Sequence, residues 1–160
     1  MAKKVADQLV DTLEKAGVRR IYAVTGDSLN EVNEAVRKNG RLRWIHVRHE
    51  ETGAYAAAAE AQLTGELACC AGSSGPGHVH LINGLYDAQR SGARVLAIAS
   101  TIPSREFGTE YFQETNTIKL FDDCSYYNQV ATTPEQFPRM LQGAMQAAIS
   151  SCCLLYTSPS

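Results

Sequence analysis

The stretch that decides the fold of this chain is Trp44-Ile45-His46-Val47-Arg48-His49-Glu50-Glu51-Thr52-Gly53-Ala54-Tyr55-Ala56-Ala57-Ala58-Ala59-Glu60. Its apolar start predicts a short strand over 43–47, and the alanine run predicts a helix that ends near Thr64-Gly65. Two carboxylates, Glu50 and Glu51, stand at the junction. In α/β folds such junctions face the crevice where ligands bind, so Glu50 is our leading functional candidate.

Strands and helices alternate on both sides of this stretch. Left-handed glycines are expected to end the helices at Gly17, Gly40 and Gly65. The rhythm predicts an α/β fold: a parallel sheet of about five to six strands with helices on both faces. The other predicted strands lie at 20–24, 67–71, 94–99 and near 125–130, and the other helices at 5–16, 28–39, 78–90 and from about 134.

Composition narrows the function classes. A chain of 160 residues suits one domain. Its 17 acidic and 15 basic residues nearly balance, so we expect no nucleic-acid partner. The N-terminus has no apolar signal region and no run is long enough to span a bilayer, which favours a cytoplasmic location. The five cysteines form no metal-binding pattern, and we predict reduced thiols and no metal site.

Two motifs allow more than one interpretation. Gly26-Asp27-Ser28-Leu29 matches the nucleophile block of GDSL-type esterases, but no aspartate is followed three residues later by a histidine to activate the serine. Ser28 and Glu31 instead predict a capping box. The glycine-rich segment 72–77 lacks the lysine of a P-loop, and either approaches a ligand closely or makes a tight turn, as in a non-catalytic nucleotide-binding module.

The segment from Ser100 to about Thr115 interrupts the alternation of strands and helices. It contains Tyr111-Phe112-Gln113-Glu114, with two aromatic residues that no helical or strand periodicity explains. Loops of this length inside a compact domain are usually functional or disordered.

Four blocks together resemble one family. They are Val24-Thr25-Gly26-Asp27-Ser28, Arg48-His49-Glu50, Gly75-Pro76-Gly77-His78-Val79-His80-Leu81-Ile82-Asn83-Gly84-Leu85 and Phe112-Gln113-Glu114. Residues 3–149 resemble the N-terminal pyrimidine-binding (PYR) domain of thiamine-diphosphate enzymes in the pyruvate oxidase and acetolactate synthase group. The likeness is greatest to pyruvate oxidase and the quinone-reducing pyruvate dehydrogenase. Asp27 departs from the pattern, because many relatives have a glycine there.

The resemblance implies a role for individual residues. Glu50 would be the catalytic glutamate that hydrogen-bonds N1′ of the aminopyrimidine and activates thiamine diphosphate. Glu51 would be a bystander. Phe112 and Gln113 would lie near substrate or flavin. The other cofactor-binding residues would be Thr25, Gly26, Pro76 and His80.

The resemblance also implies a reaction that needs more than this chain. The parent would be a thiamine-diphosphate- and FAD-dependent enzyme that oxidatively decarboxylates pyruvate and passes electrons to quinone or oxygen. Mg²⁺ and FAD would be bound by domains absent here, so the isolated chain is expected to be inactive. A second subunit of a homodimer or homotetramer would complete the site. The alternative within the family is an acetolactate synthase-like carboligase. A quinone-reducing parent would meet the inner face of the plasma membrane through its own C-terminal segment.

The end of the chain departs from the family pattern. We expect residues 1–149 to form a PYR domain without its last strand, and the serine- and proline-containing segment 150–160 to be a non-native tail outside the sheet. An apolar sheet edge would then be exposed.

Overall fold

One parallel sheet organises the chain, and the computed structural model describes residues 4–151 and 154–159. The sheet has six strands in the order β2-β1-β3-β4-β6-β5, and every neighbouring pair is parallel. Because all strands are parallel, their carboxyl ends meet at one edge of the sheet. The strands are β1 (Arg20–Ala23), β2 (Arg43–His46), β3 (Ala68–Gly72), β4 (Val95–Thr101), β5 (Asn128–Val130) and β6 (Leu154–Pro159).

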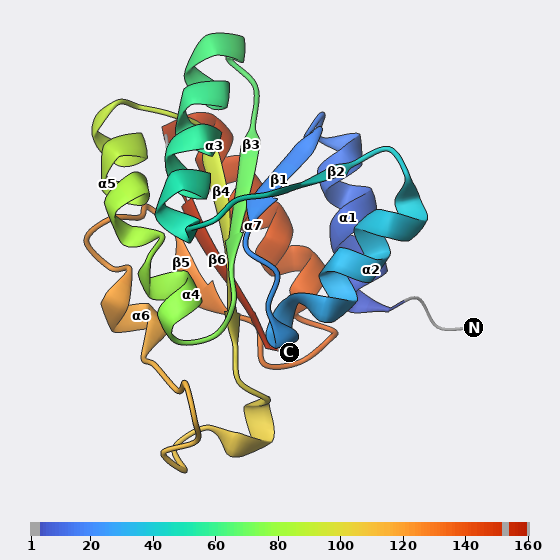
Figure 1. Cartoon of the computed structure of the whole chain (residues 1–160), viewed down its shortest axis with the longest axis vertical. Helices are drawn as coiled ribbons and strands as arrows, with labels where there is room; N and C mark the ends of the chain where they lie inside the picture. Colours follow the sequence, from blue (N-terminus) through green and yellow to red (C-terminus); the bar gives the residue numbers. More distant parts are fainter. Residues whose placement is uncertain (1–3, 152–153, 160) are drawn as a thin grey trace.

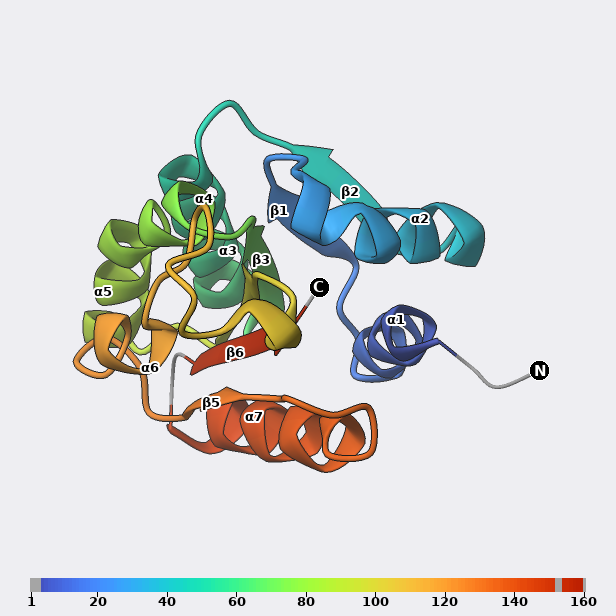
Figure 2. The same cartoon turned by 90° about the horizontal axis from the view of Figure 1, so that it is seen from below.

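Helices cover both faces of the sheet, as the sequence predicts. Figure 2 shows α3, α4, α5 and α6 on one side and α1, α2 and α7 on the other. The helices are α1 (Val5–Lys15), α2 (Asn30–Asn39), α3 (Glu50–Thr64), α4 (Pro76–Val79), α5 (Ile82–Arg90), α6 (Thr117–Leu120) and α7 (Phe137–Ser151), with short 3₁₀ turns η1 (Asp27–Leu29) and η2 (Ser104–Glu106).

The central strands explain why two helical layers are needed. Every residue of β3 and β4 is buried, which is typical of parallel strands covered on both faces. Leu9 and Phe137 belong to the core under α1, α2 and α7. Leu85 and Phe121 belong to the core under α3 and α5. The α/β fold predicted from the sequence is therefore confirmed.

Glycines end three helices as predicted. Gly40 and Gly65 are the C-terminal caps of α2 and α3, with φ of 68° and 73°. Gly17 follows α1 with φ of 90°. Residues with a side chain adopt such left-handed conformations only at a cost, so glycine is favoured at all three positions.

The last strand corrects one expectation. Residues 154–159 do not lie outside the sheet: α7 extends to Ser151, and β6 lies between β4 and β5. Residues 152, 153 and 160 lie outside the described part of the chain. Ala97 of β4 pairs with Leu155, and Gln129 of β5 pairs with Tyr156. Strand pairing is made by backbone groups, so β4 gains a neighbour without an alternating valine pattern. The described sheet thus includes a sixth strand from this segment, and its edge strands are β2 and β5. A non-native origin for the segment stays a prediction.

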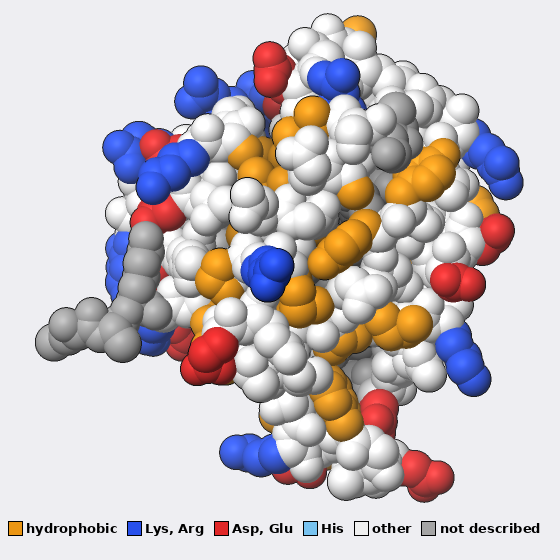
Figure 3. Space-filling model, turned by 180° about the vertical axis from the view of Figure 1, so that it is seen from behind, with side chains coloured by type: hydrophobic (Ala, Val, Ile, Leu, Met, Phe, Trp, Pro, Cys, Tyr) orange, Lys and Arg blue, Asp and Glu red, His pale blue; other side chains and the backbone are white. Residues whose placement is uncertain are grey.

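The surface combines small apolar areas with ion pairs. Figure 3 shows hydrophobic side chains gathered in patches on the face that carries α7. Tyr127, Met140 and Met145 are partly buried and pack against the core. Of the helices described, none has the length and apolar character needed to cross a membrane.

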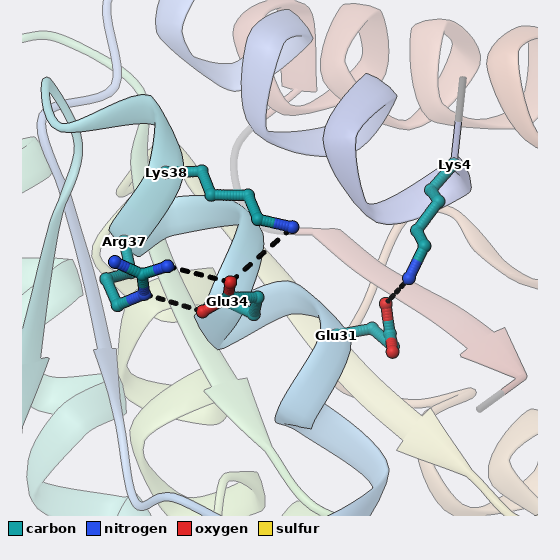
Figure 4. A network of polar contacts seen from close by, with 5 residues as sticks. All are labelled: Lys4, Glu31, Glu34, Arg37 and Lys38. Carbon is teal, nitrogen blue, oxygen red and sulfur yellow. Dashed lines mark hydrogen bonds and ion pairs between the residues drawn. The ribbon is translucent and has the colours of Figure 1, made fainter. Parts of the chain in front are cut away.

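Ion pairs hold α1 and α2 together and line the outer side of α2. Lys4 Nζ lies 2.8 Å from Glu31 Oε2 and joins the start of α1 to α2 (Figure 4). On the exposed side of α2, Glu34 pairs with Arg37 and Lys38. The hydrogen bond from Arg37 lowers the pKa of Glu34 to about 2.

Candidate functional site

Glu50 lies where the sequence predicts, at the first position of α3. His49 caps the helix, and its Nδ1 accepts a hydrogen bond from the backbone N–H of Glu51 at 3.3 Å. The strand β2 ends at His46, so the chain reaches the carboxyl edge of the sheet just before Glu50. Glu50 is only 8% exposed, which is uncommon for a glutamate at a helix terminus.

The two carboxylate oxygens of Glu50 have different surroundings. His80 Nδ1 lies 3.0 Å from Oε2 and donates a hydrogen bond to it. The other oxygen, Oε1, faces Gly77, where a Cβ atom would lie 3.2 Å away. Within residues 4–151, no hydrogen bond is made to Oε1. His80 therefore fixes one oxygen while the other stays available to a ligand.

The glycine-rich turn between β3 and α4 forms the wall beside Glu50. A Cβ on Gly72 would lie 2.6 Å from the carbonyl oxygen of Gly77, so the turn folds back on itself too tightly for a side chain. Gly75 has φ of 67°, and Pro76 then begins α4 at a position where its missing N–H costs nothing. At Gly72 the segment therefore makes a tight turn. At Gly77 the absence of a side chain lets the backbone lie close to the Glu50 carboxylate.

Ser28 supports this turn and does not cap a helix. Its Oγ lies 2.9 Å from Ser73 Oγ and accepts a hydrogen bond from the backbone N–H of Ser74 at 3.0 Å. The predicted capping box is wrong, because the cap of α2 is Leu29 and Glu31 pairs with Lys4. A nucleophilic serine needs a base within hydrogen-bond reach, and these partners supply none. The geometry therefore gives no support to the esterase interpretation.

His78 joins the turn to the loop that follows β4. Its ring is 1% exposed, with Nδ1 2.8 Å from the carbonyl oxygen of Ser100 and Nε2 2.5 Å from Thr115 Oγ1. A carbonyl only accepts, so Nδ1 carries the proton and Nε2 accepts from the hydroxyl of Thr115. Burial lowers the pKa of His78, with the Ser100 carbonyl opposing the shift. The neutral ring thus has a single tautomer that holds both segments.

The loop between β4 and α6 projects from the body of the domain (Figure 1). Phe112 is 80% exposed at this loop. Gln113 has a left-handed φ of 67°. It packs on the turn, because a Cβ added to Gly75 would lie 2.7 Å from the Cβ of Gln113. Glu114 Oε1 accepts a hydrogen bond from the backbone N–H of Gly108 at 2.7 Å. The base of the loop is docked, while its aromatic side chain faces outward.

The structure brings some of the predicted site residues together and not others. Glu50 and His80 are in direct contact. Gly26 packs on the turn, because a Cβ there would lie 2.4 Å from Ser73 Oγ. Thr25 and Pro76 are exposed at the ends of β1 and the turn. Phe112 is 80% exposed, and the predicted place of Phe112 and Gln113 near substrate or flavin stays a prediction.

Sequence reasoning missed several residues around Glu50. His49 stacks on His80, with ring centroids 4.4 Å apart and planes inclined by 26°. Glu51, expected to be a bystander, accepts a hydrogen bond from Asn83 Nδ2 at 3.1 Å. The place of His49 just before the helix marks it as a capping residue, but the partners of His78 and Asn83 lie too far along the chain for local patterns to indicate.

A separate cavity of about 560 Å³ lies between α1, η1 and the start of α7. Leu9, Leu29 and Phe137 contribute to its apolar lining, and Lys4 and Glu31 also line it. Figure 4 shows the ion pair between these two charged residues. Glu50 and residues 72–77 do not line this cavity, but Ser28 and Ser100, which bond to the turn and to His78, do.

One family model and several known proteins are similar to this chain. Residues 3–120 match the family model described as thiamine pyrophosphate enzyme, N-terminal TPP binding domain. An uncharacterized 42.6 kDa protein of Pseudomonas amyloderamosa is 58% identical over 91% of this chain and 37% of its own length. The pyruvate oxidase of Lactiplantibacillus plantarum is 38% identical over 88% of this chain and 23% of its own length. The chloroplastic acetolactate synthase 3 of Brassica napus is 33% identical over 92% of this chain and 23% of its own length.

Proposed function

This chain belongs to the family of thiamine pyrophosphate enzymes, through their N-terminal TPP-binding domain, and we propose that it supplies the aminopyrimidine side of a thiamine diphosphate site. The observation that carries the proposal is Glu50: a carboxylate 8% exposed at the carboxyl edge of a parallel sheet. One of its oxygens is held by His80, and the other faces the glycine turn.

The surroundings of Glu50 fit a flat aminopyrimidine ring. Gly77 brings backbone beside Glu50 Oε1 without a side chain in between. Gly26 lies against Ser73 of the same turn, so a second loop borders the site without bulk. Glycine at both places lets backbone come close to a ring. The residues present therefore suit a planar heterocycle that offers a nitrogen to a carboxyl group.

The part of this chain in the reaction would be to hold a proton at the aminopyrimidine ring. Thiamine diphosphate, when bound, supplies the electron sink for the decarboxylation of a 2-oxo acid. Glu50 would hold the proton at N1′ of the aminopyrimidine through Oε1. His80, by donating to Oε2, would keep the carboxyl group in one orientation, which saves reorganisation during the reaction. Thr25 and Pro76 would border the ring from the strand and turn ends.

For the whole enzyme we propose oxidative decarboxylation of pyruvate with FAD. Identity is 38% to a pyruvate oxidase and 33% to an acetolactate synthase. The run His80-Leu81-Ile82-Asn83-Gly84-Leu85 and the loop at Phe112 and Gln113 also resemble the former group more. An acetolactate synthase-like carboligase is the second candidate, because that match covers 92% of the chain.

The remaining parts of the reaction would come from outside this domain. The chain covers 23% of the length of the pyruvate oxidase, so we place the sites for Mg²⁺, the diphosphate and FAD in other domains. A second subunit of a homodimer or homotetramer would close the site, in the cytoplasm or at the membrane's inner face. The 160-residue chain alone should not turn over pyruvate when thiamine diphosphate and Mg²⁺ are added.

The decisive experiment substitutes Glu50→Gln in the whole enzyme that carries this domain. Glutamine keeps the shape and the hydrogen bond from His80 but cannot share a carboxyl proton. We expect hydrogen–deuterium exchange at C2 of bound thiamine diphosphate to slow by roughly 10²–10⁴-fold. Cofactor binding should be largely kept, since charge-assisted contacts to the diphosphate dominate affinity.

Glu51→Gln is the matched control for this substitution. A glutamine at this position can still accept the hydrogen bond from Asn83 through its amide oxygen. We expect C2 exchange to stay close to that of the unmodified enzyme. Slower exchange in Glu51→Gln with normal exchange in Glu50→Gln would shift the assignment by one residue. Normal exchange in both variants would reject the proposal.

A further inference from the structure

Three potential metal ligands meet beside the glycine turn. They come from the cap of α3, the first residue of α3 and the end of α4: His49, Glu50 and His80. One ligand atom from each lies within 4.8 Å of the others. The side chains of His49 and His80 are 47% and 42% exposed, so an ion can reach both from solvent. Glu50 forms the inner side of the cluster.

The pairing of two histidines is not explained by thiamine binding, which uses Glu50. The His49 and His80 rings stack at 4.4 Å, a spacing at which two protonated imidazoles would repel each other. As neutral rings they are good ligands for divalent transition metals, and a carboxylate completes a common donor set. His80 donates through Nδ1 to Glu50, which leaves its Nε2 lone pair free.

The distances suit a compact ion after a small adjustment. Zinc bonds of about 2.0–2.2 Å at tetrahedral angles place donor atoms roughly 3.4 Å apart. The donor atoms here lie within 4.8 Å of one another, and both imidazoles are partly exposed. Rotation of the rings onto an ion would exchange their stacking, and the hydrogen bond that His49 Nδ1 accepts from the backbone N–H of Glu51, for bonds to the metal. The positive end of α3 opposes a cation. The carboxylate of Glu50, with that of Glu51 3.8 Å from His49 Nδ1, supplies the compensating charge.

We propose that His49, Glu50 and His80 bind a divalent transition metal ion of the zinc class. Two imidazoles and one carboxylate leave at least one coordination position for water. Because the ion takes the carboxylate, it competes with any other ligand of Glu50. The competition with an aminopyrimidine rests on the proposed function, whereas metal binding itself does not.

The experiment is a calorimetric titration of the 160-residue chain with zinc chloride, without thiamine. Cys152 and Cys153 are replaced by serine throughout, so that thiols cannot capture the ion. We expect one ion per chain, with affinity reduced at least tenfold in His49→Ala, in His80→Gln and in Glu50→Gln. His46→Ala is the matched control, because His46 is an exposed histidine on β2 outside the cluster.

Cobalt provides a second reading of the same site. Co²⁺ should give the visible spectrum of nitrogen and oxygen ligands, and that spectrum should be lost in His49→Ala. Equal affinity in His49→Ala and His46→Ala, or weakening by His46→Ala to the same degree, would overturn the proposal as adventitious surface binding. Circular dichroism identifies any variant that fails to fold, and His49→Ala, at an exposed position, keeps the test decisive.

A final arm separates this inference from the proposed function. In the whole enzyme, zinc should weaken the apparent affinity for thiamine diphosphate, and His49→Ala should relieve that effect. If zinc fails to bind the chain, the metal site is rejected while the C2 exchange results for Glu50→Gln stand. If zinc binds but does not compete, the metal site stands and the placement of the aminopyrimidine at Glu50 is rejected.

Discussion

The turn after β3 and the loop after β4 lie at the same edge of the sheet and are built on opposite principles. The turn is filled: Gly72, Gly75 and Gly77 each lie so close to neighbouring atoms that a Cβ would crowd them. The loop is open: Phe112 is 80% exposed, and a Cβ added to Gly108 would meet no atom within 4 Å. One segment is fixed within the domain, and the other presents an aromatic side chain to solvent.

This contrast suggests a division of labour in the candidate site. A rigid wall holds Glu50 in place before any ligand arrives, which is what preorganised chemistry requires. An exposed aromatic side chain on a projecting loop is more useful for contacts with another domain or subunit. His78 lies between the two segments and bonds to both Ser100 and Thr115. Substitutions in the turn, the connecting histidine and the loop should therefore have decreasing effects on stability.

Among substitutions in the turn, at His78 and in the loop, the largest effect is expected from Gly72→Ala. The added Cβ would lie 2.6 Å from the carbonyl oxygen of Gly77 and 2.7 Å from the Cα of His78. Both are backbone atoms in a buried turn and cannot move aside without disturbing Glu50. We expect about 3 kcal/mol of lost unfolding free energy, at the upper end of overpacking costs. Chemical denaturation of the purified chain measures it.

Gly65→Ala separates crowding from backbone conformation. Gly65 has φ of 73° but open space around a Cβ, so only left-handed strain opposes alanine there. That strain costs about 1 kcal/mol. A loss in Gly72→Ala no greater than in Gly65→Ala would show that the turn is looser than its distances indicate.

An intermediate effect is expected from His78→Phe. Phenylalanine keeps a ring against Phe121 but leaves the Ser100 carbonyl and the Thr115 hydroxyl without their partner. Loss of these two hydrogen bonds should cost roughly 2–3 kcal/mol. His46→Phe, at an exposed position on β2, controls for the change of residue type.

The pH dependence of stability gives His78 a specific signature. Its pKa is lowered in the folded chain by burial, so the unfolded chain binds a proton more readily. The contribution of His78 to the free energy of unfolding is therefore complete above the ordinary histidine pKa of about 6.5. It decreases as the pH falls from there through the lower pKa of the folded chain. His78→Phe should remove this part of the dependence. A variant with the same dependence below pH 6.5 as the unmodified chain would contradict the assignment.

The sequence predicts this molecule best where local rules decide. The helix ends at Gly40 and Gly65 can be predicted because a left-handed cap depends only on the residue at that position and its neighbours. The alternation of strands and helices likewise indicates β1 to β4. The capping box predicted at Ser28 is wrong because the Ser28 hydroxyl bonds to Ser73 and Ser74, which no local pattern reveals. Long-range partners of this kind are decided by packing alone.

The prediction that the last segment lies outside the sheet is wrong for a different reason, because β6 pairs there. Its expected absence rested on side-chain pattern, whereas β4 and β5 pair with it through backbone groups. In the site, Glu50 could be indicated by its place at a strand-to-helix junction. Its hydrogen bond with His80 spans 30 residues, and the stacking of His80 on His49 depends on how α4 packs beside α3.

The smallest effect on stability is expected from Phe112→Ala. A side chain that is 80% exposed buries little apolar area, so the unfolding free energy of the chain should change by less than about 0.5 kcal/mol. Phe121→Ala is the matched control: Phe121 is fully buried, and its removal should cost about 3–5 kcal/mol. In the whole enzyme Phe112→Ala should instead alter substrate or flavin binding, if the loop meets another domain as proposed. A loss above 1 kcal/mol in the isolated chain would mean that the loop closes on this domain and that the contrast between turn and loop is mistaken.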